Sequence, residues 1–151
     1  MEQWIREEML LGADAMARLA GSHVAVFGIG GVGSFCAEAL ARGGVGELTL
    51  VDHDTVSLSN LNRQLCALHS TLGQGKAAVM ARRIAEINPA CRVHVLEKCY
   101  CEQEKAAFFG SQYDYIVDCI DMVSSKLSLI QEAMARGIPI LSAMGTGNKL
   151  D

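Results

Sequence analysis

Residues 23–34 read HVAVFGIGGVGS, and this stretch decides the fold of the 151-residue chain. Its first five residues, HVAVF, favour a β-strand because β-branched and aromatic side chains suit a pleated surface. The glycines that follow satisfy the pattern G-x-G-x-x-G, which marks the turn from a strand into a helix in a doubly wound sheet. We expect Gly28 to permit the tight turn, Gly30 to let a phosphate approach the backbone, and Gly33 to allow close packing of helix on strand.

The rest of the chain alternates short β-rich runs with longer helical runs. Near-continuous Val, Ile and Leu runs favour strands that are covered on both faces, as in a parallel sheet. We expect strands at residues 23–27, 47–52, 92–96, 115–118 and 139–142, and helices at residues 14–20, 32–42, 76–88, 102–109 and 123–136. The sequence therefore predicts an α/β fold with a Rossmann-like, doubly wound, mainly parallel sheet and an N-terminal helical extension.

Periodicity also predicts which helical residues are buried. The helix at 32–42 is apolar nearly all round, which is typical of a buried crossover helix. In the helix at 123–136 we expect Leu127, Ile130 and Met134 to face the core.

The length of the chain fits one domain. We expect residues 1–22 to form the helical extension and residues 23–151 to form the nucleotide-binding domain. The chain stops directly after a turn at 145–147 that follows the fifth strand, so we expect a C-terminal truncation of a longer protein.

The composition argues against several classes of protein. No apolar run approaches the roughly 18 to 20 residues that span a bilayer. The first residues, MEQWIREE, carry acids where a signal peptide carries bases, so we expect a cytoplasmic protein without a membrane partner. The net charge of −4 argues mildly against a nucleic-acid-binding surface but does not exclude a local basic patch. The six cysteines form no CxxC pair, and we interpret them as small apolar residues.

The glycine turn predicts an adenine nucleotide, because the helix that follows presents N–H groups and a partial positive charge to phosphates. Ser34 adds a hydroxyl there. Asp52 ends the second strand, where an acid accepts hydrogen bonds from ribose hydroxyls. Because NAD, FAD and ATP sites share this geometry, a dehydrogenase is the first alternative.

The segment after the second strand favours ATP. Residues 52–64 (DHDTVSLSNLNRQ) form a long polar loop with Arg63, at the sheet edge where ligands bind. Lys76 opens the next helix, which is unfavourable against the helix dipole unless a phosphate lies nearby to neutralise it. Two such cations suit charge development on phosphorus better than hydride transfer. The alternatives are a structural clamp for Arg63 and a solvated side chain for Lys76.

The fourth strand ends in residues 118–121 (DCID). In the doubly wound order this strand lies beside the first, so Asp121 faces the glycine turn across a crevice. A carboxylate aimed at phosphates needs a cation between them, and Mg²⁺ is the common solution. The alternative is that Asp118 or Asp121 caps the following helix.

Taken together, these motifs resemble those of the ubiquitin-activating-enzyme-like superfamily, which includes ThiF, MoeB and HesA. The matching pieces are GIGGVGS (28–34), DHDTVSLSNLNRQ (52–64), GKA (75–77), INP (87–89), DCID (118–121) and GIPIL (137–141). The resemblance implies that ATP and Mg²⁺ are bound and that AMP is attached to a carboxylate with release of pyrophosphate. It assigns the phosphates to Gly28, Gly30, Gly31, Gly33, Asn60, Arg63 and Lys76, the ribose to Asp52 and Mg²⁺ to Asp121, with Ser34 and Asp54 in the same nucleotide site.

Many members of the superfamily are homodimers that donate an N-terminal arginine into the neighbour's site. Arg6 matches that arginine, although by itself it is typical of an ordinary surface residue. The resemblance therefore implies a homodimer in which Arg6, Arg63, Lys76 and Asp121 are catalytic.

Finer detail favours one branch of the superfamily. Residues 6–12, 38–42 and 66–70 are similar to the TcdA-type tRNA threonylcarbamoyladenosine dehydratases. This implies a cyclising dehydration of threonylcarbamoyladenosine in tRNA. The alternative substrate is the C-terminus of a ubiquitin-like sulfur-carrier protein, as in ThiF and MoeB. A nucleotide-binding module without chemistry is a third hypothesis. One departure is Gln74, where many relatives carry a lysine.

Overall fold

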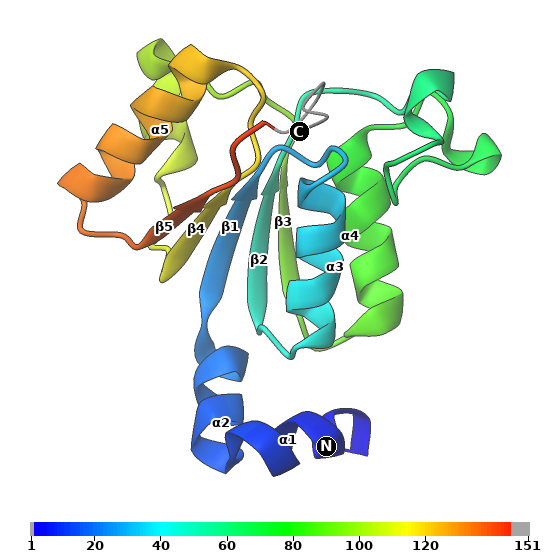
Figure 1. Cartoon of the computed structure of the whole chain (residues 1–151), viewed down its shortest axis with the longest axis vertical. Helices are drawn as coiled ribbons and strands as arrows, with labels where there is room; N and C mark the ends of the chain where they lie inside the picture. The colour runs from blue at the N-terminus through cyan, green and yellow to red at the C-terminus, as the bar shows by residue number, and fades with distance from the viewer. Residues whose placement is uncertain (1, 146–151) are drawn as a thin grey trace, which may run out of the picture.

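The computed structural model describes residues 2–145 and contains one sheet of five parallel strands (Figure 1). The strands are β1 (His23–Phe27), β2 (Glu47–Val51), β3 (Arg92–Leu96), β4 (Tyr115–Asp118) and β5 (Ile140–Ser142), in the order β3-β2-β1-β4-β5. The predicted doubly wound α/β fold is confirmed. The strand order reverses between β1 and β4, and that switch point is where such sheets bind ligands.

Helices cover both faces of the sheet. α3 (Gly33–Arg42) and α4 (Lys76–Ile87) lie on one face, and α5 (Val123–Ala135) and the 3₁₀-helix η4 (Glu102–Phe108) lie on the other (Figure 1). Because side chains alternate between the faces of a strand, each face builds its own core. The core under α3 and α4 includes Val24, Val26, Ala37, Leu48, Leu50, Met80 and Ile84. The core under α5 and η4 includes Ala25, Phe27, Tyr100, Phe108, Ile116 and Leu129.

The N-terminal extension consists of η1 (Glu2–Trp4), α1 (Ile5–Leu11) and α2 (Ala13–Gly21), below the amino ends of the strands in Figure 1. The indole N–H of Trp4 donates to the carbonyl of Arg42 at 2.7 Å, which attaches the extension to the end of α3. The predicted helix corresponds to α2, and α1 precedes it. No helix of residues 2–145 is both long enough and apolar enough to cross a bilayer.

The long segment between β2 and α4 contains two short 3₁₀-helices, η2 (Leu58–Asn60) and η3 (His69–Thr71). Its start folds back on its end: Thr55 and Gly75 form an antiparallel bridge, and Val56 N–H donates to the Gln74 carbonyl at 2.8 Å. This pairing holds the polar loop against the first turn of α4.

Several details differ from the sequence prediction. Leu127 and Met134 of α5 are 56% and 71% exposed, so the predicted buried face is wrong for these two residues. The buried residues are instead Ser125, Lys126, Leu129 and Ala133. The reason is that Lys126 forms a buried ion pair, described below, and therefore faces the sheet in place of the predicted apolar residues.

One edge strand and two helices also depart from expectation. β3 lies at the sheet edge and is largely exposed, rather than covered on both faces. α3 buries only one side, since Phe35 is exposed. The segment predicted as a helix at 102–109 forms the 3₁₀-helix η4. The predicted turn through Thr146 and Gly147 lies outside the described residues.

A buried ion pair joins β4, α5 and the end of β5. Asp118 is fully buried, and Lys126 Nζ lies 2.6 Å from its Oδ2. The Ser142 hydroxyl donates to the same oxygen at 2.6 Å, and Ile120 N–H donates to Oδ1 at 3.0 Å. Lys126 also donates to the carbonyl of Ala143 at 2.9 Å. The predicted helix cap is not made by Asp118, because its hydrogen bonds hold the turn before α5.

We expect Lys126→Met to lower the free energy of unfolding by about 3 to 5 kcal/mol, because it leaves the Asp118 carboxylate buried without a counter-charge. Urea denaturation measures this. The matched control is Lys105→Met, since Lys105 pairs with Glu132 at 2.8 Å on the surface, where screening makes an ion pair weak. Similar losses in the two variants would contradict the role given to the buried pair.

Candidate functional site

A cavity of about 550 Å³ opens at the carboxyl ends of β1, β2 and β4. Its wall brings together Gly28, Gly30, Gly31, Asp52, Asp54, Arg63, Lys76 and Asp121, all of them predicted site residues. These side chains come from the glycine turn, the polar loop, the start of α4 and the segment after β4. The predicted convergence at the switch point of the sheet is therefore present.

Backbone contacts explain two of the glycines. Gly28 has a φ of +88°, and a Cβ there would lie 2.6 Å from the Cys119 carbonyl oxygen. A Cβ on Gly33 would lie 1.7 Å from the carbonyl oxygen of Gly28. Added Cβ atoms on Gly30 and Gly31 would have no neighbour nearer than 3.6 and 3.5 Å, and both residues border the cavity. Gly28 and Gly33 thus serve packing, while Gly30 and Gly31 present bare backbone to the cavity.

Asp52 ties the glycine turn to the polar loop. Its Oδ2 accepts the Ile29 N–H at 2.6 Å, and its Oδ1 accepts the Asp54 N–H at 2.8 Å. Each carboxylate oxygen has a second lone pair, so the predicted contact with ribose hydroxyls is compatible with these bonds and stays a prediction.

Lys76 is buried at the start of α4, with 6% of its surface exposed. Its Nζ lies 2.9 Å from Oδ2 of Asp54, and its backbone N–H donates to the Asp54 carbonyl at 3.0 Å. The hydrogen bond from the Lys76 ammonium holds the pKa of the Asp54 carboxyl below its ordinary value. Asp54 therefore supplies the negative charge that a lysine at a helix N-terminus needs, and the solvated-side-chain alternative is wrong.

Arg63 lies over the glycine turn. A Cβ on Gly31 would be 3.5 Å from its Cγ, while its guanidinium donates to the Ser59 carbonyl at 3.0 Å and to Asn62 Oδ1 at 2.9 Å. The guanidinium is therefore partly a clamp on its own loop, as the alternative proposed. It also borders the cavity, and its remaining N–H groups are available to an anion.

Ser34, Asn60 and Gly33 do not line the cavity. The buried Ser34 hydroxyl donates to the Gly30 carbonyl at 2.6 Å and accepts the Leu65 N–H at 3.2 Å. Asn60 is buried as well, and its Oδ1 accepts a backbone N–H at 3.0 Å within the polar loop. These side chains brace the glycine turn and the loop, and their direct contact with a nucleotide stays a prediction.

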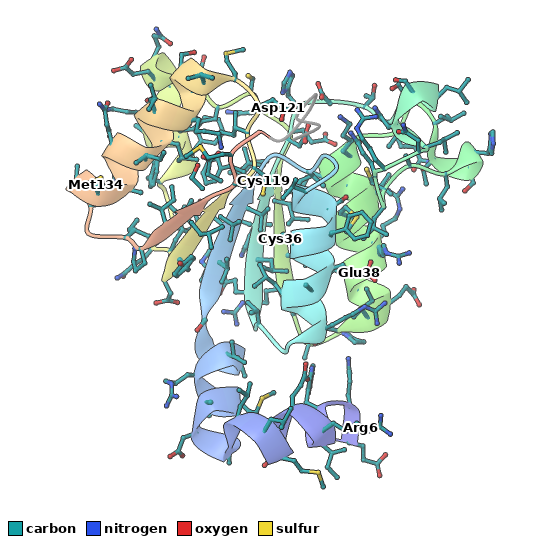
Figure 2. The ribbon with its side chains drawn as sticks, viewed as in Figure 1. Arg6, Cys36, Glu38, Cys119, Asp121 and Met134 are labelled. Carbon is teal, nitrogen blue, oxygen red and sulfur yellow. The ribbon has the colours of Figure 1, made fainter. Side chains whose placement is uncertain are left out.

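Asp121 and Arg6 lie at opposite ends of the molecule (Figure 2). Asp121 is exposed on the cavity wall, and no cation pairs with it among residues 2–145. It does not cap α5 through its side chain. An exposed carboxylate beside a phosphate site suits Mg²⁺, which takes one or two carboxylates and phosphate oxygens as ligands. Arg6, on α1, does not reach the cavity of its own chain.

Some residues of the cavity wall were missed by the sequence analysis, namely Gln64, Lys98, Cys99, Tyr100 and Ser125. Lys98 follows β3 by two residues, so the rule that ligands bind at the carboxyl ends of strands was the signal for it.

Cys119 also borders the cavity, beside the glycine turn. Burial raises the pKa of its thiol to about 12. The thiol is therefore protonated at neutral pH, which agrees with the interpretation of Cys119 as a small apolar residue and not as a nucleophile.

Known proteins resemble the chain in both sequence and fold. A family model described as the ThiF family matches residues 5–149. The tRNA threonylcarbamoyladenosine dehydratase of Bacillus subtilis (strain 168) is 48% identical over 100% of this chain and 59% of that protein. The molybdopterin-synthase adenylyltransferase of Escherichia coli (strain K12) is 35% identical over 94% of this chain and 57% of that protein.

Among solved structures, the E. coli tRNA N6-threonylcarbamoyladenosine dehydratase TcdA in complex with ATP superposes with a TM-score of 0.96. It is 41% identical, and the match covers 99% of this chain and 62% of that chain. This chain thus spans between 57% and 62% of the length of these three relatives.

We expect Gly33→Ala to destabilise the chain by about 3 kcal/mol or more, because a methyl group there overlaps the Gly28 carbonyl and the backbone must move. Gly21→Ala is the control, since a Cβ at Gly21 has no neighbour within 4 Å. Thermal unfolding of both variants measures the difference. A Gly33→Ala chain as stable as the Gly21→Ala chain would show that the turn is not held by this contact.

Proposed function

The chain belongs to the ThiF family, and we propose that it is the nucleotide-binding part of an enzyme that uses ATP to adenylate a carboxylate. The observation that carries the proposal is that Arg63, Lys76 and Asp121 line one cavity together with the glycine turn. A dehydrogenase needs no such cations, because hydride transfer develops little charge on phosphorus. The E. coli relative TcdA has been solved in complex with ATP and in complex with AMP, the nucleotides before and after such a reaction.

In the proposed complex the phosphates lie on the backbone of Gly30 and Gly31, at the N-terminus of α3. The helix dipole and the direction of the backbone N–H groups at this end of the helix favour an anion there. Asp52 accepts hydrogen bonds from the ribose. Lys76 keeps one of its three N–H donors on Asp54 and turns the other two toward phosphate oxygens.

The substrate carboxylate attacks the α-phosphorus of ATP and forms an acyl–AMP. The bond from that phosphorus to the α,β-bridging oxygen breaks, and pyrophosphate leaves with the oxygen and the electron pair. The carboxylate is already ionised at neutral pH, so the reaction needs no general base. Arg63 and Lys76 stabilise the charge that spreads over the phosphate oxygens, and the rigid cavity holds the reactants in line.

Mg²⁺ fits this site, because the exposed Asp121 carboxylate lies on the wall that faces the proposed phosphates. Asp121 would hold the ion together with phosphate oxygens. When bound, Mg²⁺ neutralises phosphate charge in the transition state.

The proposed substrate is threonylcarbamoyladenosine in tRNA. The support is that the B. subtilis dehydratase shares more identity with this chain, 48%, than the molybdopterin-synthase adenylyltransferase, at 35%. After adenylation, a nitrogen or oxygen of the same substrate attacks the activated carboxyl carbon, a ring closes, and AMP leaves with the carboxyl oxygen. The net result is loss of one water at the cost of ATP. We propose a cytoplasmic location, which a tRNA substrate would support.

Arg6 acts across a homodimer in this proposal. It lies far from Asp121 in the same chain (Figure 2), so it serves only a cavity in another copy. The same helix exposes Ile5, Met9 and Leu10, with 53%, 79% and 85% of their surfaces accessible. An exposed apolar face of this kind marks an interaction surface, which supports a partner at α1.

The deciding experiment is an AMP-release assay on the full-length protein with ATP and Mg²⁺. It compares tRNA that carries threonylcarbamoyladenosine with unmodified tRNA and with a carrier protein that ends in Gly-Gly. We expect AMP only with the modified tRNA. Carrier-dependent exchange of pyrophosphate with ATP would instead support the sulfur-carrier alternative. ATP binding without AMP release from either substrate would leave only a nucleotide-binding module.

We expect Lys76→Ala to lower turnover by about 100-fold or more, by analogy with loss of one oxyanion-stabilising donor, while the affinity for ATP falls much less. Single-turnover AMP release and equilibrium ATP binding measure the two effects. Lys105→Ala, an exposed lysine in η4 outside the cavity wall, is the control. Equal losses of binding and turnover would count against a role of Lys76 in the transition state.

A further inference from the structure

The amino ends of β1, β2 and β3 lie at the end of the sheet opposite their carboxyl ends, where the nucleotide cavity opens (Figure 1). A second cluster of polar side chains lies near these amino ends. The register pairs His23 with Glu47 and Thr49 with His94. Residues two apart on a strand point to the same face. His23, Glu47 and His94 therefore lie side by side on the face that carries α5 and η4.

The three side chains bring their ligand atoms to one point. His94 Nε2 lies 2.7 Å from Glu47 Oε1, and His23 Nδ1 lies 3.8 Å from the same oxygen. One ligand atom of each residue lies within 4.8 Å of the other two. Zinc bonds of about 2.0 to 2.1 Å place neighbouring ligand atoms of a tetrahedral site about 3.3 Å apart. The observed separations from Glu47 Oε1, 2.7 Å to His94 and 3.8 Å to His23, lie on both sides of that value. Small changes of the side-chain rotamers would therefore make room for an ion.

The Thr49 hydroxyl orients the His23 ring, because its oxygen lies 2.8 Å from His23 Nε2. In the tautomer that carries its proton on Nε2, the ring donates to Thr49. Nδ1, the ring nitrogen nearer Glu47, then keeps its lone pair. Metal-binding histidines are held in this way by a hydrogen bond from the other ring nitrogen.

Charge and exposure define what kind of ion fits. Arg92 pairs with Oε2 of Glu47 and leaves Oε1 to the two imidazoles. The His94 side chain is half exposed, so water can complete the coordination. Two imidazoles and one carboxylate suit zinc, and three protein ligands with an open position form a familiar zinc geometry.

We propose that His23, Glu47 and His94 form a zinc site that joins β1, β2 and β3 at the amino edge of the sheet. Nδ1 of His23, Oε1 of Glu47 and Nε2 of His94 are the ligands, and water occupies the open position. The ion fixes the exposed edge strand β3 to the centre of the sheet. This site is separate from the nucleotide cavity and does not depend on the adenylation chemistry.

The test is titration of the purified chain with Zn²⁺ against a chromophoric chelator, together with Co²⁺ as a spectroscopic substitute. We expect one ion per chain and visible Co²⁺ bands without the near-ultraviolet charge-transfer band of thiolate ligands, which excludes the six cysteines. We expect His94→Gln and Glu47→Gln to weaken Zn²⁺ binding by about tenfold or more. Zn²⁺ should also raise the melting temperature of the wild-type chain but not that of His94→Gln.

Arg92→Ala separates a metal site from an ordinary ion-pair network. The substitution removes a positive charge beside the proposed ion, so Arg92→Ala should bind Zn²⁺ at least as tightly as the wild type does. His53→Gln is the second control, because Asp52, His53 and Asp54 also approach one another, at the nucleotide cavity.

Three results would overturn the proposal: no saturable Zn²⁺ binding, binding that survives both His94→Gln and Glu47→Gln, or binding lost in His53→Gln instead. Because His94 lies on an exposed edge strand, His94→Gln should fold, and its circular dichroism spectrum verifies this. If Glu47→Gln does not fold, His94→Gln decides alone.

Discussion

The structure depends on the close contact between the glycine turn and its neighbours at the end of β1. The Gly28 carbonyl occupies the position of a Cβ on Gly33, and the Cys119 carbonyl occupies that of a Cβ on Gly28. Any side chain at these two points pushes α3 off the sheet or β4 away from β1. The same contacts leave Gly30 and Gly31 as bare backbone at the switch point. The glycines of the turn thus serve packing first, and the phosphate site proposed there follows from that packing.

Three charged groups at or near the cavity are held by partners before any ligand arrives. Asp54 holds Lys76, Asp52 holds two backbone N–H groups, and the buried Lys126 holds Asp118. Such preorganisation matters for a reaction on phosphorus, because side chains that are already fixed need not be ordered in the transition state. Asp121, in contrast, is exposed on the cavity wall, which suits the Mg²⁺ site proposed there.

The two ends of the sheet carry different chemistry. At the carboxyl ends of the strands, loops of varied length meet and form a cavity that suits a nucleotide. At the amino ends, the side chains come from the strands themselves, so their spacing is set by the register of β1, β2 and β3. This rigidity makes the histidine cluster a fitting place for a structural ion.

The sequence by itself determined the order of the five strands and of the helices between them, the glycine turn and part of the cavity wall. These follow from local patterns: a strand–glycine–helix unit, apolar runs of strand length, and the rule that ligands bind where parallel strands end. It also identified Arg63, Lys76 and Asp121, because their types and positions are unusual for their local context.

Only the tertiary structure decided the partners of these residues. The rotation of α5 depends on Lys126 finding Asp118, the compensation of Lys76 depends on Asp54, and Ser34 and Asn60 turn out to brace loops. The meeting of His23, Glu47 and His94 likewise joins residues that are 24 and 47 positions apart. A sequence pattern reports local preference, whereas these contacts are made between distant segments and are fixed by the packing of the whole sheet.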